Sequence, residues 1–200
     1  MMHPDTEVQF ISEEIGYGVV AKKFIPRGTI TWVQDELDQI YTPEQVEKMK
    51  DVSKQMIDKY TFRNNKGNFV LCWDISKYVN HSFRSNCLST AYDFEIAVRD
   101  IHPGEELTDD YGYLNVTDAF PAKNEGTSRK VVYPDDLLNY HEQWDRTLQE
   151  TMPFLSGVEQ PLMSLVSNKI QQEIKMVLNG EKQMESILNV YYQEQTNHQP

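Results

Sequence analysis

Short apolar runs alternate with polar turn residues over the first part of the chain. The runs Val8–Ile11, Val19–Ala21 and Thr29–Val33 are separated by Gly16-Tyr17-Gly18 and by Pro26-Arg27-Gly28. Short runs of β-branched and aromatic residues bounded by glycine and proline are typical of strands. This pattern predicts a series of short strands joined by tight turns.

The spacing of the apolar residues becomes helical after Thr42. Thr42-Pro43-Glu44-Gln45 has the sequence of a capping box, in which the Thr and Gln side chains bond to each other's backbone amides. The pattern predicts an inserted helix near residues 43–59 with one apolar face. The residues expected on this face are Val46, Met49, Val52, Met56 and Ile57.

Strand-like runs return after this helix. Tyr60–Phe62 and Phe69–Trp73 flank the turn residues Asn65–Asn68, which predicts a hairpin. Glu95–Val98 is a further run of the same kind. Residues 1–115 are therefore expected to form a mostly β domain that carries the inserted helix.

The composition changes after residue 115. Residues 116–133 are polar, with Pro121 and Gly126 among them, which indicates a linker. Residues 134–194 are expected to form a helical C-terminal subdomain packed on the β part, and residues 195–200 a frayed tail. Three helices are expected: one from Pro134 that contains Leu137, Leu138, Trp144 and Leu148, one over Leu162–Leu178 that begins after the break at Met152-Pro153, and one over Gln183–Tyr192.

Composition narrows the class of protein. A chain of 200 residues can bury a core without disulfides, and Cys72 and Cys87 are its only cysteines. It has no apolar run of about 18 residues and no signal-peptide pattern at its start. We expect a soluble protein that does not contact membranes and is cytoplasmic, or nuclear in a eukaryote, with secretion as an effector left open.

The charge bears on the kind of partner. Nineteen basic and 31 acidic side chains leave a formal net charge of −12. Attraction to a phosphate backbone is therefore not expected to drive binding, so we expect no direct contact with nucleic acid. The charge favours a basic partner, although acidic surfaces also keep proteins soluble.

Two polar strings lie about twenty residues apart. Asn80-His81-Ser82-Phe83-Arg84-Ser85-Asn86-Cys87 precedes Gly104-Glu105-Glu106-Leu107-Thr108-Asp109-Asp110-Tyr111-Gly112-Tyr113, and Gly16-Tyr17-Gly18 lies upstream of both. Taken singly, each has a simpler explanation. The first string suits a loop whose side chains bond to its own backbone, the second a hairpin into an edge strand, and Gly16-Tyr17-Gly18 a tight turn. In this order and together, they resemble the signature of SET-domain protein lysine methyltransferases over roughly Val8 to Tyr113.

The resemblance implies a fold and an activity. The fold is the SET-domain fold, in which small β-sheets surround a knot-like active site. The activity is transfer of a methyl group from S-adenosyl-L-methionine to the side-chain amine of a lysine in a protein substrate. The resemblance assigns Gly16, Tyr17, Gly18, Asn80, His81 and Tyr111 to the cofactor pocket, Tyr111 to catalysis, Tyr113 and Tyr60 to the channel for the substrate lysine, and Asn86 to holding the loop.

The implied reaction needs a neutral amine. A lysine with a pKa near 10.4 is neutral in about one of ~2,500 molecules at pH 7, a term of roughly 4–5 kcal/mol. A neighbouring sulfonium and partial burial lower that pKa, so a strong base is not obligatory. Tyr111, a phenol with a pKa near 10, is a poor base, and we expect it to orient the amine and the methyl group. Tyr113 and Tyr60 would contact the aliphatic stem of the lysine, although a half-buried strand tyrosine explains Tyr60 equally well.

The chain departs from the family pattern after the tyrosine. Many members carry a cysteine-rich zinc-binding tail there, and this chain has no cysteine after Cys87. We expect no bound zinc, and we expect the helical part to close the pockets, with Phe120 or Trp144 over the adenine or the lysine slot. Ser85 stands where the family usually has proline, and Phe83 where many members have cysteine, but neither change removes a reacting group.

Two other classes of function remain open. The chain could be a catalytically weak SET-fold protein that docks a partner through its helical half, although a degenerate relative would often lose Tyr111. A metal-assisted hydrolase would use His81, Asp109 and Asp110, but their spacing matches no standard metal site.

Overall fold

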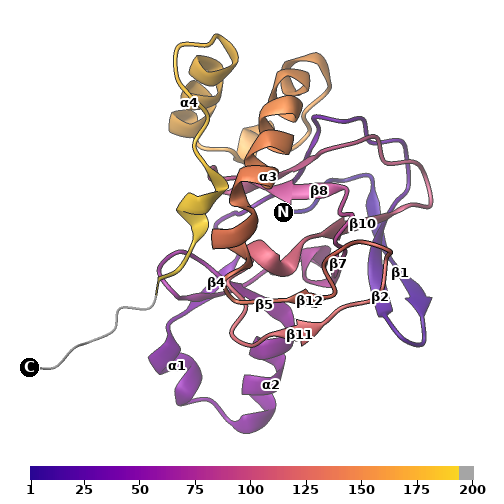
Figure 1. Ribbon diagram of the computed structural model, residues 1–200, viewed down its shortest axis with the longest axis vertical. Coiled ribbons are helices and arrows are strands. Elements are labelled where there is room, and N and C mark those ends of the chain that lie inside the picture. The colour runs from indigo at the N-terminus through magenta and orange to yellow at the C-terminus, as the bar shows by residue number, and fades with distance from the viewer. Residues whose placement is uncertain (194–200) are drawn as a thin grey trace, which may run out of the picture.

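The strands of the protein are short, as the sequence predicts, and they lie mostly in its first half. The computed structural model describes residues 1–193 and is shown in Figure 1. The strands are β1 (Thr6–Ser12), β2 (Gly16–Ala21), β3 (Ile30–Val33), β4 (Gln39–Tyr41), β5 (Thr61–Arg63), β6 (Phe69–Leu71), β7 (Asn80–His81), β8 (Cys87–Ser89), β9 (Phe94–Ala97), β10 (Glu106–Asp109), β11 (Phe120–Pro121) and β12 (Val131–Val132). The helices are α1 (Pro43–Glu47), α2 (Asp51–Tyr60), α3 (Asp136–Thr151) and α4 (Asn168–Leu178).

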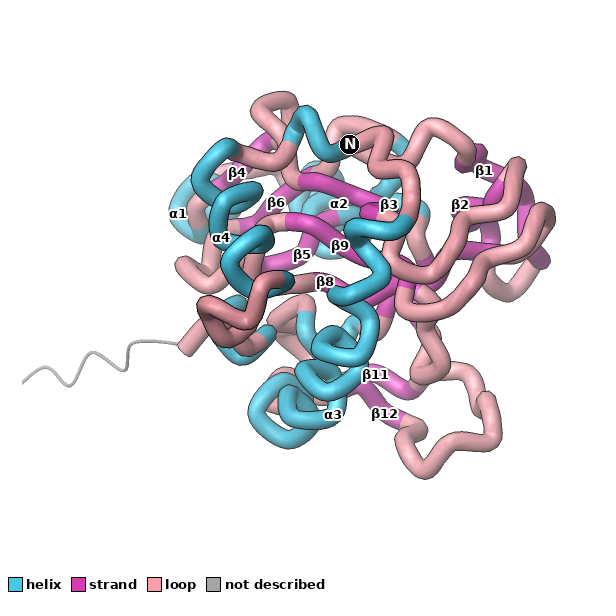
Figure 2. Tube along the Cα trace, turned by 90° about the horizontal axis from the view of Figure 1, so that it is seen from above, coloured by secondary structure: helices cyan, strands magenta, loops and turns pink. Residues whose placement is uncertain are grey.

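The strands form several small sheets. One has the order β1-β2-β10-β7, and β10 runs antiparallel to β2 but parallel to β7. Two further sheets have the orders β3-β9-β8 and β4-β6-β5, and Figure 2 shows β3, β9 and β8 side by side. β11 and β12 form a two-stranded ribbon. The predicted class, mostly β with a helical C-terminal part, is confirmed.

The predicted hairpin after Tyr60 is also confirmed. β5 pairs antiparallel with β6, with Thr61 opposite Leu71 and Arg63 opposite Phe69. In the turn, the side chain of Asn64 accepts from the backbone amides of Lys66 and Asn68, and Gly67 has a φ of +78°. Asparagine and glycine suit this turn because the first bonds its own backbone and the second tolerates positive φ.

The inserted helix differs from the prediction in two ways. It is divided into α1 and α2, although the capping box at Thr42 forms as expected. The predicted apolar face is not buried, because the two helices project from the body of the molecule (Figure 1). Only Ile57 of α2 is buried, whereas Val52 and Met56 are exposed.

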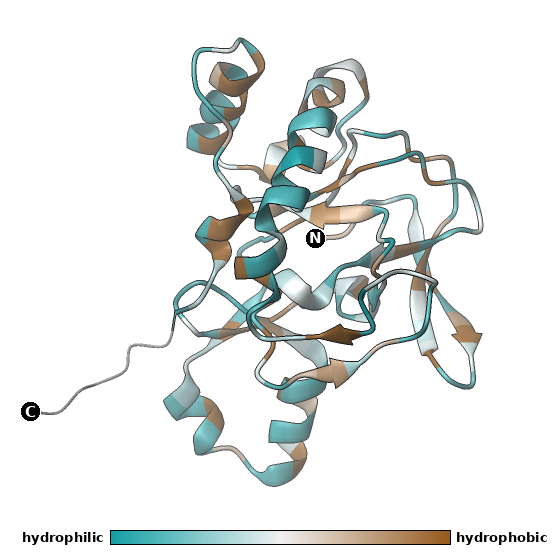
Figure 3. Ribbon diagram, viewed as in Figure 1, coloured by the Kyte–Doolittle hydropathy of each residue, from teal (hydrophilic) through white to brown (hydrophobic). Residues whose placement is uncertain are grey.

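Two apolar clusters form the core. One lies within the β half of the protein, around Val19, Ile25 and Leu107. The other joins the β half to the C-terminal helices, because Phe94 and Tyr113 pack in the same cluster as residues of α3 and α4. The visible side of α3 is mostly hydrophilic in Figure 3, as expected for a helix whose other face is buried. The C-terminal helices thus share a core with the β part, as the sequence predicted.

The C-terminal helices only partly follow the prediction. The first is α3, and the second begins at Asn168 after the cap residue Ser167 rather than at Leu162. The third expected helix, Gln183–Tyr192, is wrong: only the 3₁₀ helix Ile187–Val190 forms there. The expected frayed tail, residues 195–200, lies outside the described residues. No helix within residues 1–193 is long and apolar enough to cross a membrane.

Candidate active site

The two polar strings lie side by side. β7 and β10 pair in parallel, which places Thr108 opposite Asn80 and Asp109 opposite His81. Fully buried Asn86 holds the loop between them, since its amide donates to the Glu106 carbonyl at 2.8 Å and its Oδ1 accepts from the Thr108 amide at 2.9 Å. The pinning role expected of Asn86 is therefore confirmed.

His81 connects this loop to the tyrosine. Its Nδ1 accepts a hydrogen bond from the backbone N–H of Tyr111 at 3.1 Å. Burial lowers the pKa of His81, so the ring is neutral at pH 7. An imidazole that accepts at Nδ1 carries its proton on Nε2, and this buried Nε2 has no partner within the described chain. The ring therefore offers a free donor beside Tyr111.

The glycine turn is crowded by side chains of this chain. A Cβ built on Gly18 would lie 2.2 Å from Glu106 Oε1 and 2.9 Å from Asn80 Nδ2. The amide of Asn80 donates to Glu106 Oε1 at 2.7 Å and to the carbonyl of Tyr17 at 3.0 Å. Gly16 has a φ of +84°, which favours glycine. Glycine at 18 is thus required by the close approach of Asn80 and Glu106.

Gly18→Ala is expected to separate Asn80 from Glu106 and to destabilise the protein by about 1–2 kcal/mol, because an added methyl group must displace both side chains. Gly157→Ala is the matched control, because its Cβ would meet nothing within 4 Å. Urea unfolding would measure the loss of stability, and equal results for the two variants would contradict the requirement for glycine at position 18.

Tyr111 begins a short 3₁₀ helix, Tyr111–Tyr113, that directly follows β10. Its hydroxyl donates to the carbonyl oxygen of Val79 at 2.7 Å. Burial raises the pKa of Tyr111 well above its usual value, and the carboxyl groups of Asp109 and Glu95 raise it further. The phenol is therefore neutral, its proton points at Val79, and the remaining lone pairs of its oxygen are available to a ligand.

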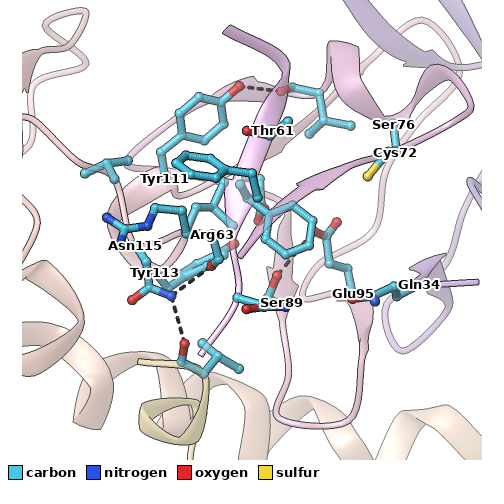
Figure 4. Close-up of a pocket in the computed structure, with 18 of the residues that line it drawn as sticks. Gln34, Thr61, Arg63, Cys72, Ser76, Ser89, Glu95, Tyr111, Tyr113 and Asn115 are labelled. Atoms are coloured by element: carbon cyan, nitrogen blue, oxygen red, sulfur yellow. Dashed lines mark hydrogen bonds between the residues drawn. The ribbon is translucent and has the colours of Figure 1, made fainter. Parts of the chain in front are cut away.

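Tyr111 also lines a cavity with a volume of about 520 Å³ (Figure 4). A cavity of this volume falls within the range of ligand pockets in proteins. Gly16, Gly18, Asn80 and His81 do not line it, whereas Tyr111 lines the cavity and also bonds to His81 through its backbone N–H. The cavity walls that matter for the chemistry are Tyr60, Glu95, Asp109, Tyr111, Tyr113 and Phe120.

The two tyrosines expected around the lysine slot, Tyr113 and Tyr60, lie in different surroundings. Tyr113 is only 1% exposed, and its ring packs edge-on against Trp144 with 5.1 Å between centroids. Its hydroxyl oxygen accepts from the amide of Asp110 at 3.1 Å, so Tyr113 lines the cavity as a buried residue whose side chain is fixed in place. Tyr60 is partly exposed and packs against Tyr78.

The two lid candidates also separate. Trp144 is 5% exposed, belongs to the apolar core and does not line the cavity, so its expected place over the adenine or lysine slot is wrong. Phe120 does line the cavity, 6.3 Å from the ring of Tyr111 and 6.1 Å from that of His81 between centroids. It lies on β11, within the segment expected to be a linker.

Residues 116–133 form hydrogen bonds with the first polar string and an ion pair with the second. The carboxylate of Glu125 accepts from the hydroxyl of Ser82 and from the amide of Phe83, each at 2.8 Å. The guanidinium of Arg129 bonds to Asp110 and to Asp136, the first residue of α3. Residues 116–133 are therefore a structured closure of the site.

Sequence reasoning missed Glu95, Glu125 and Arg129. None of them lies in a motif, and Glu125 meets Ser82 and Phe83 across more than forty residues of chain. One available signal was Asp110, an acidic residue next to the tyrosine that would need a cation if it were buried. Within residues 1–193, no three His, Cys, Asp or Glu side chains are placed to hold a metal ion, so the metal-assisted hydrolase gains no support.

Comparisons with known proteins give the family. Residues 16–112 match the family model of the SET domain. This segment of 97 of the 200 residues is therefore a SET domain, and it holds the glycine turn, the first polar string, and the second string as far as Gly112, with Tyr111 included. It is similar to the histone-lysine N-methyltransferase Set2 of Drosophila melanogaster, with 29% identity over 117 residues. This alignment covers 52% of the present chain and 5% of that relative.

Proposed function

We propose that the protein transfers a methyl group from S-adenosyl-L-methionine to the side-chain amine of a lysine in a protein substrate. The observation that carries the proposal is the position of Tyr111, which lines the cavity and also contacts His81 through its backbone. Such a residue can contact a donor on one side and an amine on the other.

The residues present fit the donor. The unpartnered Nε2–H of His81 is a buried donor group that a ligand would satisfy. The backbone at Gly16–Gly18 and the side chain of Asn80 lie beside the same strands, since Asn80 bonds to the carbonyl of Tyr17. S-adenosyl-L-methionine supplies an electrophilic methyl group when bound, and these residues would hold its polar parts.

The cavity suits the lysine. Tyr60 and Phe120 offer apolar surface for the stem of the side chain, and the oxygen of Tyr111 can accept from the amine or from the methyl group. Its proton is held by Val79, so that oxygen acts as an acceptor. The formal charge of −12 agrees with a substrate that is basic around its lysine.

A non-catalytic docking protein is the rival function. Such a protein has no need for a tyrosine hydroxyl that is fixed by Val79 and lines a cavity. The shared core also leaves the C-terminal helices as part of the fold, with α3 tied to the site by Asp136. These contacts favour the enzyme.

The first test of the proposal measures donor binding and transfer separately. We expect calorimetry to show binding of S-adenosyl-L-methionine, and we expect label from the methyl-tritiated donor to appear on lysines of core histones or of basic ribosomal proteins. Chemically acetylated histones, whose lysine amines are blocked, are the matched control. Tight donor binding without labelling of any lysine would favour the docking protein.

A further inference from the structure

Two carboxyl groups in the cavity have no part in the function so far. Glu95 on β9 and Asp109 at the end of β10 line the cavity together with Tyr111, and Figure 4 shows Glu95 on the far side of the cavity from Asn115. Asp109 is 3% exposed, and its Oδ1 has no hydrogen-bond partner in the described chain. Glu95 Oε1 accepts from the hydroxyl of Ser89 at 3.2 Å.

No basic side chain of the described residues forms an ion pair with either carboxyl group. Burial raises the pKa of both, and for Asp109 the neighbouring Glu95 raises it further. Two neighbouring carboxyl groups share one negative charge more readily than they carry two. Lys59, Arg63 and Lys77 also line the cavity, but none of them forms an ion pair with Glu95 or Asp109.

Other charged groups lie around this pair. Cys87, whose thiol has a raised pKa, and the phenol of Tyr111 are neutral neighbours. Asp110 adds a negative charge, but Arg129 binds it on the side of α3. The remaining titratable or charged groups that face the pair or line the cavity are Cys72, the N-terminal amine, Asp58, Lys59, Tyr60, Arg63, Lys77, Asp93, Tyr113 and Asp118.

We propose that Glu95 and Asp109 form the subsite that receives the ammonium head of the substrate lysine and takes its proton. The proposal rests on the proposed function, because it concerns the amine that is to be methylated. An N–H bond of the ammonium breaks, an O–H bond forms on the carboxylate, and the nitrogen keeps the electron pair that a new bond to the methyl carbon requires. The proton later leaves to water through the cavity.

The chemistry of the pair suits both parts of this role. Its negative charge attracts a cationic side chain. A neutral alcohol or amide in the same place would lack this attraction. A raised carboxyl pKa narrows the gap to the lysine pKa, and each unit of narrowing makes proton transfer tenfold more favourable. An ordinary surface carboxylate, about six units below lysine, would be a far weaker acceptor.

The kinetic test uses Asp109→Asn and Glu95→Gln at two pH values, with core histones as the substrate. At pH 7.5 we expect kcat of each variant to fall at least about tenfold, and at pH 9.5 the loss should shrink to less than about threefold, because the amine then loses its proton to solvent more easily. Donor affinity should not change. Glu14→Gln, an exposed loop residue, is the control. Equal losses at both pH values would overturn proton acceptance.

Asp109→Asn is expected to fold. The pKa of Asp109 is higher in the folded state than in the unfolded state, so this carboxyl group stabilises the fold less as the pH rises above its unfolded-state pKa. Replacing it with a neutral amide therefore removes no electrostatic stabilisation at neutral pH. Circular dichroism should show an unchanged or higher Tm.

A second measurement separates this proposal from the proposed function. We expect n-butylammonium chloride, which matches a lysine side chain in length and charge, to bind the wild type in an NMR titration, and n-butanol not to bind. Asp109→Asn should weaken butylammonium binding at least about fivefold. Loss of discrimination between the two probes in the wild type would overturn the subsite. Retained discrimination in a protein that methylates no lysine would overturn the proposed function alone.

Discussion

Tyr111→Phe is expected to lower methyl transfer about 100-fold while donor affinity stays within about twofold, since removing one oriented polar group at a reacting centre has effects of this order. The hydroxyl is fixed by its 2.7 Å bond to the Val79 carbonyl, so its oxygen has a defined direction in the cavity. Its raised pKa keeps it neutral at pH 7, and its contribution is alignment in the transition state.

Single-turnover transfer and calorimetry would separate these two effects. Tyr133→Phe removes the same atom from an exposed residue outside the cavity and should leave both quantities unchanged. A matching loss of donor affinity in Tyr111→Phe would mean that the hydroxyl holds the donor in the ground state, contrary to the role assigned to it.

The parts of the fold that the sequence predicted are those that local chemistry determines. The hairpin at Asn64–Asn68 and the cap at Thr42 form because the residues within each turn satisfy one another. The apolar face of α2 was predicted wrongly, since spacing cannot say whether anything packs on a face, and Val52 and Met56 meet solvent. The helix expected over Gln183–Tyr192 does not form, and Asp145 of α3 instead accepts hydrogen bonds from the hydroxyl of Ser186 and the backbone amide of Ile187, in the middle of that segment.

The candidate site also has parts that could be predicted from the sequence and parts that could not. The resemblance to the family brought Asn80, His81 and Tyr111 together, and the pairing of β7 with β10 places them side by side. Tyr113 lines the cavity, and its burial against Trp144 depends on a helix that begins more than twenty residues further along the chain. Contacts of this range leave no local pattern.

Arg129 explains how the site is closed without a cysteine-rich tail. Its guanidinium joins Asp110, next to Tyr111, to Asp136 at the start of α3, and its side chain is 11% exposed. The planar group also lies over the rings of Phe83, Tyr140 and Trp144. A bidentate cation of this kind is suited to holding two buried carboxylates in fixed positions.

Arg129→Ala is therefore expected to destabilise the protein by roughly 3–5 kcal/mol, because it leaves the carboxylates of Asp110 and Asp136 buried without their cation. A loss of this size lowers the Tm of a chain of this length on the order of 10 °C. Arg129→Lys should lose part of this stability, since an ammonium cannot bond to both carboxylates in the fork geometry of arginine.

Thermal and urea unfolding would measure the loss, and Arg146→Ala is the matched control, an exposed arginine of α3 for which we expect a change below about 0.5 kcal/mol. The triple variant Asp110→Asn, Asp136→Asn, Arg129→Met tests the cause, because it removes both buried charges together with their cation. If it is as unstable as Arg129→Ala, the stacking on Phe83 and Trp144 stabilises the closure and the ion pairs do not. If it recovers most of the lost stability, the instability of Arg129→Ala comes from two buried carboxylates without a cation. The link between Tyr111 and α3 is then electrostatic.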